Sequence, residues 1–215
     1  MLSTIRLATE RDADQILEIY APFCEENSFV SFEVRSPTLE EMQQRIAKVI
    51  QKLPWLVCDR DGEILGYVYA APHRERSAYQ WSVDVSVYIG KKFRRSGIGR
   101  ALYTSLFEIL VLQGYYNAYA GITLPNPASE KLHKLMGFEP IGIYPSVGYK
   151  GGAWRDVAWF GRSLRSRSTN PKPPRNINTL KLESAMTSGM SYLEERVGEG
   201  ERGRGGEGEM GSRGE

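Results

Sequence analysis

Apolar and polar residues alternate with two different periods along the chain, and the period identifies the elements. Residues 4–8, TIRLA, have the pattern of a short strand. Residues 13–23 and 39–53 then repeat apolar residues every three or four positions, which is typical of amphipathic helices. Thr9 and Thr38 each stand three residues before an acidic residue, the spacing of a helix N-cap. The pattern therefore predicts one strand followed by two helices.

A period of two takes over after residue 54. Residues 55–59 and 63–72 are apolar runs separated by the turn Arg-Asp-Gly, a strong signal for a β-hairpin. In the longest strand, residues 79–90, valines alternate with polar residues, so Val85 and Asp84 lie on opposite faces. Three consecutive strands are expected here.

The rest of the pattern adds two helices and three strands. One helix spans roughly residues 99–113, and a shorter one, closed by a glycine, spans residues 126–137, with a strand at 115–123 between them. Two further strands fill residues 138–164. Strands and helices in this order indicate an α/β or α+β domain built on one mixed sheet.

Regular periodicity fades after residue 165, where proline, glycine and alternating charge replace it. Such a segment buries too little apolar surface to offset the entropy of ordering it. We therefore expect a folded domain at residues 1–164 and a low-complexity, mostly disordered tail at residues 165–215. Apolar residues at helical spacing between 182 and 197 leave a weak amphipathic helix as an alternative, and the closing Arg-Gly repeats leave RNA binding as another.

Composition narrows the function classes. The chain has 215 residues, 41% of them hydrophobic, and a formal net charge of +2, so a nucleic-acid partner is not expected. Cys24 and Cys58 lie among apolar residues, which favours buried thiols in a reducing compartment over a disulfide or a metal site. No apolar run reaches about 18 residues, and charges interrupt the N-terminal segment, so we expect a cytoplasmic protein that neither enters a membrane nor binds a metal.

The segment KKFRRSGIGRALY, residues 91–103, has the composition of an anion site. A glycine turn between a strand and a helix gathers backbone N–H groups at the positive end of the helix dipole, where phosphate binds readily. Gly97 and Gly99 have no Cβ, so an anion can approach the backbone. Basic side chains add charge around the turn, namely Lys91, Lys92, Arg94, Arg95 and Arg100. The alternative is a tight turn with a solvated basic rim. The dinucleotide and Walker motifs are both absent.

Two motifs in this half of the chain resemble those of the GNAT superfamily of acetyl-CoA-dependent N-acetyltransferases. RRSGIG, residues 94–99, is similar to the signature Arg/Gln-x-x-Gly-x-Gly/Ala, and NPASEKLHKLMGF is similar to the family's Asn…Leu-Tyr-x-x-x-Gly-Phe segment, with His133 at the tyrosine position. AYQWSVDVSVYI, His133 and GYKGGAWRDVAWF resemble the phosphinothricin and methionine sulfoximine acetyltransferase branch. The resemblance covers about residues 4–164 and implies a single domain with a mostly antiparallel central sheet flanked by helices.

The resemblance also implies a binding site for acetyl-CoA, a small-molecule amine as acceptor and a homodimer. The pyrophosphate would sit on the turn formed by Arg94, Arg95, Ser96, Gly97, Ile98 and Gly99, with Arg100 beside it. The strand segment Val87, Tyr88 and Ile89 would pair with the pantetheine arm, and Asn126 would contact the cofactor. Substrate contacts would come from Arg74, Glu75 and Arg76.

Acetyl transfer to an amine requires a base, and the sequence offers Asp84 and His133. Either could take the ammonium proton, and His133 could instead protonate the departing thiolate. The branch usually carries glutamate where this chain has Asp84, which is shorter by one methylene, or about 1.5 Å. No nucleophile paired with a histidine is visible, so transfer is expected to be direct, in a ternary complex. The alternatives are a solvent-facing carboxylate and a surface histidine, and, for the whole chain, a non-catalytic acyl-CoA-binding domain or an RNA-associated adaptor.

Overall fold

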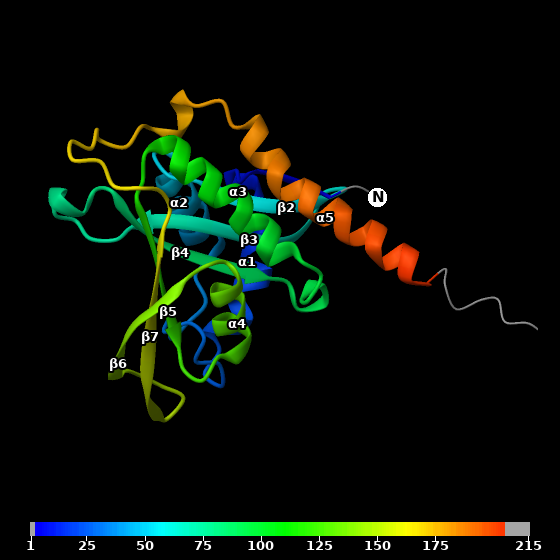
Figure 1. Ribbon diagram of the computed structural model, residues 1–215. Coiled ribbons are helices and arrows are strands. Elements are labelled where there is room, and N and C mark those ends of the chain that lie inside the picture. The colour runs from blue at the N-terminus through cyan, green and yellow to red at the C-terminus, as the bar shows by residue number, and fades with distance from the viewer. Residues whose placement is uncertain (1–2, 205–215) are drawn as a thin grey trace, which may run out of the picture.

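The computed structural model describes residues 3–204, and the side chains of residues 3–194. Figure 1 shows one sheet with helices on both of its faces. The strands are β1 (Thr4–Leu7), β2 (Trp55–Arg60), β3 (Glu63–Pro72), β4 (Ser82–Ile89), β5 (Asn117–Thr123), β6 (Glu139–Lys150) and β7 (Ala153–Ser163). The helices are α1 (Ala13–Cys24), α2 (Leu39–Ile50), α3 (Ile98–Gln113), α4 (Pro127–Leu135) and α5 (Glu183–Arg204). Up to residue 163, this succession confirms the one predicted from the sequence pattern.

The sheet is mixed and mostly antiparallel, as expected. Its strand order is β1-β2-β3-β4-β5-β7-β6, and among the described strands only β4 and β5 run parallel to each other. These two central strands pair over only three residues each, Ser82–Asp84 with Asn117–Tyr119. β4 continues to Ile89 and β5 to Thr123 without further pairing, so the strands diverge beyond Asp84.

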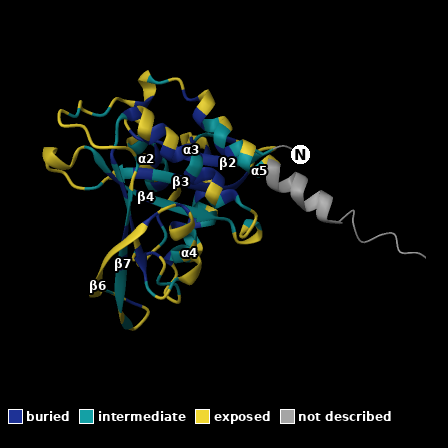
Figure 2. Cartoon of the chain, viewed as in Figure 1, coloured by how far each residue is buried: buried dark blue, intermediate teal, exposed yellow. Residues whose placement is uncertain are grey.

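Helices on the two faces of the sheet bury two apolar cores. On one face, Leu102 and Leu106 of α3 pack in the same cluster as Val83 and Val85 of β4. On the other face, Ile16 of α1 and Ile46 of α2 pack with Trp55 and Tyr67 of the sheet. Figure 2 shows the buried residues concentrated where helices and strands meet. The alternation of β4 therefore directs its valines to α3 and its polar residues to the opposite face, as predicted.

Local signals in the sequence account for the hairpin and for the second helix. The β2–β3 turn has Asp61 at φ 54° and Gly62 at φ 89°, the pair of positive φ angles that a two-residue hairpin turn needs. The hydroxyl of Thr38 accepts a hydrogen bond from the N–H of Glu41, whose side chain accepts one from the N–H of Thr38. The predicted cap and turn are both confirmed.

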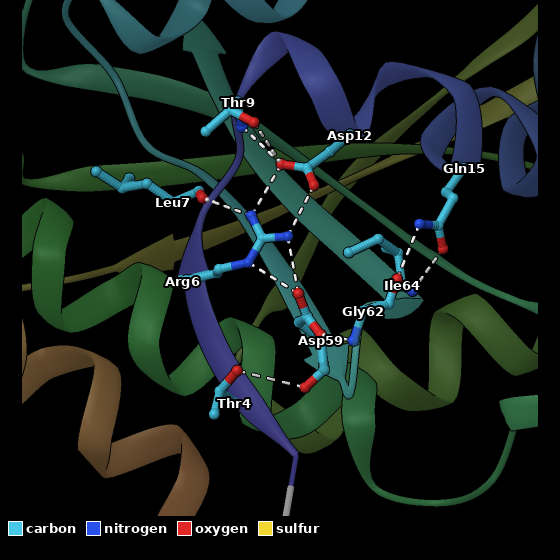
Figure 3. Close-up of polar contacts among 9 residues, drawn as sticks. All are labelled: Thr4, Arg6, Leu7, Thr9, Asp12, Gln15, Asp59, Gly62 and Ile64. Carbon is cyan, nitrogen blue, oxygen red and sulfur yellow. Dashed lines mark hydrogen bonds and ion pairs between the residues drawn. The ribbon is translucent and has the colours of Figure 1, made fainter.

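Arg6 joins the first strand to the start of the first helical segment (Figure 3). Its guanidinium donates to both carboxylate oxygens of Asp12, at 2.7 and 2.8 Å, and to Oδ2 of Asp59 on β2, at 2.8 and 2.9 Å. Asp12 also accepts a hydrogen bond from the N–H of Thr9 at 2.7 Å. This partly buried network fixes α1 and β2 relative to β1, because two carboxylates share one planar donor.

Residues 165–194 require a correction to the predicted mostly disordered tail. The chain returns across the domain, where Trp81 donates its indole N–H to the carbonyl of Lys172 at 2.8 Å and Ile177 is fully buried. α5 then packs along α3 with Leu182 and Ala185 buried, in agreement with the alternative of an amphipathic helix. The boundary at residue 164 stays a prediction, and the terminal Arg-Gly repeats at 205–215 lie outside the described residues.

The physical reason for this packing lies in α3. Ten of its sixteen residues are buried, so α3 is apolar on most of its surface and needs a cover besides the sheet. Gly189 of α5 lies at the closest approach, where an added Cβ would meet the carbonyl oxygen of Ala101, Oγ of Ser105 and Cδ1 of Ile5. Ser105 also donates its hydroxyl proton to the carbonyl of Met186 at 3.2 Å. The two helices are therefore in direct backbone contact.

Gly189→Ala is expected to destabilise the protein, against the usual effect of this substitution in a helix. Alanine normally stabilises a helix interior by about 1 kcal/mol relative to glycine. Here the methyl group would collide with the backbone of α3, and overpacking costs roughly 1–3 kcal/mol. Urea denaturation of the full chain measures the difference in the free energy of unfolding.

Ser184→Ala serves as the control, because Ser184 is an exposed residue of the same helix and its side chain makes no hydrogen bond to the described residues. Its free energy of unfolding should remain within about 0.5 kcal/mol of wild type. A Gly189→Ala protein as stable as wild type, or more stable, would contradict the close contact between α3 and α5.

Candidate active site

The divergence of β4 and β5 places Asp84 at the inner end of a gap in the sheet. Asp84 is the last residue of β4 that pairs with β5, where its partner is Tyr119. On the other side it pairs with Ala71 of β3. Its side chain lies on the face opposite the buried valines and retains 32% of its exposure. The carboxylate is thus held by strands on both sides and remains accessible.

His73 forms a hydrogen bond with Asp84. Its Nδ1 lies 2.6 Å from Oδ1 of Asp84, and its side chain keeps 16% of its exposure. Burial raises the pKa of the Asp84 carboxyl, and the hydrogen bond from His73 opposes part of that rise. A carboxylate and an imidazole therefore share the inner end of the gap.

The predicted glycine turn lies at the start of α3. Gly97 is the N-cap residue, with φ 92°, a conformation that favours glycine, and Arg95 also has a positive φ of 64°. Within residues 3–204, the N–H groups of residues 94–97 make no backbone hydrogen bond, and the first N–H groups of α3 have no partner within the helix. These N–H groups and the helix dipole together suit an oxyanion.

The same turn sits at the open end of the gap. A Cβ built on Gly99 would lie 3.1 Å from Cδ2 of Leu132 on α4 and 3.8 Å from Cγ1 of Ile89, the last residue of β4. The start of α3 therefore lies between the end of β4 and the helix that follows β5. A molecule that lay in the gap with its phosphate on the turn would extend inward toward Asp84.

The basic residues around the turn are exposed, with two of them resting on aromatic rings. The guanidinium of Arg94 lies 5.5 Å from the ring centre of Phe23, and that of Arg100 lies 4.4 Å from the ring centre of Tyr192 on α5. Lys91 and Lys92 are exposed as well, together with Arg95 and Ser96, whereas Ile98 is buried. The turn is a cationic surface, and Ile98 anchors it in the core.

The strand segment Val87, Tyr88 and Ile89 is half-buried and pairs with β3 on one side only, as the predicted pantetheine contact requires. Asn126 is the N-cap of α4, and its side chain accepts a hydrogen bond from the N–H of Ser129 at 3.1 Å. Asn126 therefore has a structural task whether or not it also contacts a ligand.

The three predicted substrate residues lie in the exposed loop that follows β3. Arg74 donates to the carbonyl oxygen of His73 at 2.9 Å, and its charge lies close enough to Asp84 to lower the pKa of that carboxyl in part. Glu75 and Arg76 are exposed, and neither makes a side-chain hydrogen bond to the residues that the structure describes. Of the three, Arg74 is the one next to the gap.

His133 lies in the core, with 4% exposure. Its Nδ1 donates to the carbonyl oxygen of Ser129 at 2.8 Å, so Nε2 accepts the hydroxyl proton of Tyr103, also at 2.8 Å. Burial lowers the pKa of His133, which favours the neutral ring. Both ring nitrogens are engaged in joining α4 to α3. The catalytic role of His133 stays a prediction. The contacts of its ring show a structural role, which is to hold α4 against α3.

A cavity of about 520 Å³ lies between α2 and the sheet. Its wall includes Trp55, Tyr67 and Tyr69, and its rim carries basic residues of α2. Ala71, the β3 partner of Asp84, also lines it, whereas Asp84 and His73 do not. The cavity therefore ends beside the gap rather than enclosing the candidate site.

Among residues 3–204, no three side chains of the metal-binding types histidine, cysteine, aspartate and glutamate come together. In the same part of the chain, no helix is both long enough and apolar enough to span a bilayer.

Comparison with known proteins decides the family. The model of the acetyltransferase (GNAT) domain matches residues 5–159. The chain belongs to the GNAT family of acetyltransferases. Phosphinothricin N-acetyltransferase of Streptomyces viridochromogenes is 34% identical to this GNAT protein over 173 residues, which cover 80% of the chain and 92% of that enzyme. The L-methionine sulfoximine/L-methionine sulfone acetyltransferase of Pseudomonas paraeruginosa is 31% identical, over 80% of this chain and 100% of its own length.

A solved structure agrees with the fold of this GNAT protein. The GNAT superfamily phosphinothricin acetyltransferase of Sinorhizobium meliloti, in complex with acetyl-CoA, superposes with a TM-score of 0.74 at 31% identity. The match covers 82% of this chain and 99% of that protein. The predicted family and fold are confirmed.

Sequence reasoning missed His73 in this acetyltransferase. It precedes the three loop residues that were predicted as substrate contacts, and it lies eleven positions before Asp84. His73 lies just after the end of β3, two positions beyond Ala71, and the register that pairs Ala71 with Asp84 brings it next to that carboxylate. Strand periodicity shows which face a residue occupies but not this register, so the sequence alone did not mark His73.

The neutral state of His133 has a consequence for stability at low pH. A folded-state pKa below the unfolded value of about 6.5 means that the unfolded chain binds more protons. The contribution of His133 is therefore fully present above about pH 6.5 and is lost as the pH falls through the folded-state pKa. Between about pH 6.5 and pH 5, we expect wild type to lose stability more steeply than His133→Gln, measured by urea denaturation. Equal slopes would contradict a buried neutral His133.

Proposed function

We propose that this chain moves the acetyl group of acetyl-CoA onto the amine of a small amino-acid-like molecule of the phosphinothricin or methionine sulfoximine type. Transfer is direct, in a ternary complex. Cys24 and Cys58 are free and buried, and burial raises the pKa of both thiols, that of Cys58 to about 11, which makes them poor acetyl carriers. Free thiols also support a reducing cytoplasm as the site of the reaction.

The observation that carries the proposal is the alignment of the glycine turn with the gap in the sheet. Acetyl-CoA supplies the acetyl group as an activated thioester. The turn from Arg94 to Gly99 would hold the pyrophosphate, and the one-sided backbone of Val87–Ile89 would hold the pantetheine arm. With those two contacts made, the gap leads to Asp84. The residues present therefore fit a molecule with a diphosphate at one end and a reactive group at the other.

Recognition of the acceptor is assigned to the loop after β3. Arg74 is exposed beside the gap and can bind a substrate carboxylate through paired N–H groups. The named relatives acetylate phosphinothricin and methionine sulfoximine, and this chain is 34% and 31% identical to the two compared above. An amino acid whose carboxylate lies on Arg74 would present its amine to Asp84.

We further propose that two copies of the chain associate through β6. Nine consecutive residues of this edge strand are exposed, and Ile141, Ile143, Val147 and Tyr149 each retain at least half of their exposure. A long apolar edge strand left in water invites pairing with another chain. In a symmetric dimer, the β6 strands of the two copies would pack together and bury these side chains.

A thiol-release assay with acetyl-CoA and paired acceptors tests the reaction and the role of Arg74. Wild type should turn over an amino-acid analogue faster than its decarboxylated amine. Because hydrogen bonds to a charged group contribute roughly 1.5–3 kcal/mol, Arg74→Ala should lower kcat/KM for the amino acid about 10- to 100-fold and leave the amine within about twofold.

Arg11→Ala, which removes an exposed arginine from the segment before α1, is the control and should leave both substrates unaffected. Equal losses on both substrates in Arg74→Ala would reject the carboxylate contact. Binding of acetyl-CoA by wild type without turnover of any amine would reject the transferase function.

Association through β6 predicts a dimer in light scattering coupled to gel filtration. Ile143→Lys places a charge in the middle of the apolar edge and is expected to yield a monomer at micromolar concentration. Leu39→Lys, at an exposed apolar residue of α2, should remain dimeric. A monomeric wild-type protein would overturn this assembly.

A further inference from the structure

We propose that His73 is the general base that deprotonates the acceptor amine, and that Asp84 positions it. The proposal rests on the acetyltransferase function proposed above and assigns its proton transfer to a residue that the family motifs do not mark in this chain. Three features carry it: the free nitrogen of the ring, the packing that fixes the ring, and the reach that the ring adds to a short carboxylate.

The hydrogen bond to Asp84 determines which ring nitrogen is basic. Because a carboxylate only accepts, the 2.6 Å contact from Nδ1 to Oδ1 makes Nδ1 the protonated nitrogen and leaves the lone pair on Nε2. Among the residues that the structure describes, none forms a hydrogen bond with Nε2. The chain has two histidines, and His133 has both nitrogens engaged. His73 alone presents a free basic nitrogen.

Aromatic rings hold the imidazole in place. Its ring centre lies 4.6 Å from that of Tyr119 on β5, and Tyr79 and Trp159 stand edge-on at 6.0 and 6.2 Å. Tyr119 is also the β5 partner of Asp84. Both His73 and Asp84 are therefore fixed by the last pairing before the strands diverge, which is the preorganisation that proton transfer requires.

The imidazole also explains how a shortened carboxylate can serve here. Asp84 stands where the family resemblance leads one to expect glutamate, and it reaches about 1.5 Å less far into the gap. A hydrogen-bonded imidazole extends the reach of the pair by the width of its ring. Reach decides whether a base can act, before its basicity does.

The reaction balances with His73 as the base. Nε2 takes one proton from the acceptor ammonium, and the neutral nitrogen forms a bond to the thioester carbonyl carbon. The carbon–sulfur bond breaks, and the sulfur leaves with its electron pair and receives the second nitrogen proton. The products are the amide, the thiol of CoA and one proton on the imidazole, which is released to water.

Charged and titratable groups from three sides face the ring. Asp84 of β4 stabilises the imidazolium that forms after proton transfer, and Arg74 of the loop after β3 opposes it. The remaining titratable neighbours are the phenols of Tyr79 and Tyr119. Of these groups, the Asp84 carboxylate is the one in hydrogen-bond contact with the ring.

His73→Asn separates a base from a positioning residue. The asparagine amide keeps a donor close to the position of Nδ1, so Asp84 retains its hydrogen bond, but no basic atom remains. We expect kcat to fall by roughly 10²- to 10⁴-fold, with the KM for acetyl-CoA unchanged and the rise of kcat/KM with pH flattened. Imidazole added to His73→Ala should restore part of the rate in proportion to its neutral form. His73→Asn and the double variant with Asp84→Asn should be equally slow, because the two residues act as a unit.

Each outcome decides between the two proposals. If His73→Asn keeps kcat within about threefold of wild type while Asp84→Asn does not, the carboxylate is the base and only the role of His73 is overturned. If wild type turns over no amine, the acetyltransferase function fails and the role of His73 with it.

A second readout needs no substrate. Nitrogen NMR of the full chain resolves two imidazoles, and the His73→Asn variant identifies that of His73. We expect the tautomer protonated at Nδ1 in wild type and no such preference in Asp84→Ala. The opposite tautomer in wild type would overturn the proposal.

Discussion

The three-residue pairing between β4 and β5 is the constraint on which the candidate site depends. β5 pairs along its whole length with β7, whereas β4 pairs with β3 from Val83 to Ile89, so each strand follows its own half of the sheet beyond Asp84. The gap between them is a necessary result of joining two antiparallel halves through one short parallel ladder. Parallel ladders need a crossover connection, and here that crossover is α3, which brings the glycine turn to the open end.

The chemical properties of Asp84 and of the glycine turn follow from their positions at the two ends of this gap. At the closed end, Asp84 is desolvated enough for the pKa of its carboxyl to rise, yet it retains a hydrogen bond from His73. At the open end, the N–H groups of residues 94–97 make no backbone hydrogen bond within residues 3–204, and Gly97 has a left-handed conformation. The two ring nitrogens of His133 are hydrogen-bonded to Ser129 of α4 and to Tyr103 of α3, so they hold these two helices together. The histidine in the family motif thus has a structural task here, and its predicted catalytic role stays a prediction, whereas His73, outside the motif, is hydrogen-bonded to Asp84.

Features that depend on local sequence could be predicted, and features that depend on contacts between distant segments could not. Strand alternation, the cap at Thr38 and the glycine turn at Gly97 each follow from a few neighbouring residues. The pair formed by His73 and Asp84 depends on the register between β3 and β4, which periodicity alone does not supply. α5 has weak amphipathicity, and Gly189 read in isolation argues against a stable helix. Its packing becomes intelligible only once α3 is known to be apolar on the side that α5 covers.

The position of α5 connects the segment after residue 164 to the anion turn. α5 lies against α3 at Ala101 and Ser105, one turn after the glycines, and its Tyr192 ring supports the guanidinium of Arg100. An arginine held over an aromatic ring loses less freedom when it binds an anion than one that is free in solvent. The helix therefore acts on the proposed cofactor site in two ways: it fixes the start of α3, and it pre-orients a cation beside the turn. On this argument residues 165–194 would support the proposed cofactor site through their contacts with α3 and Arg100.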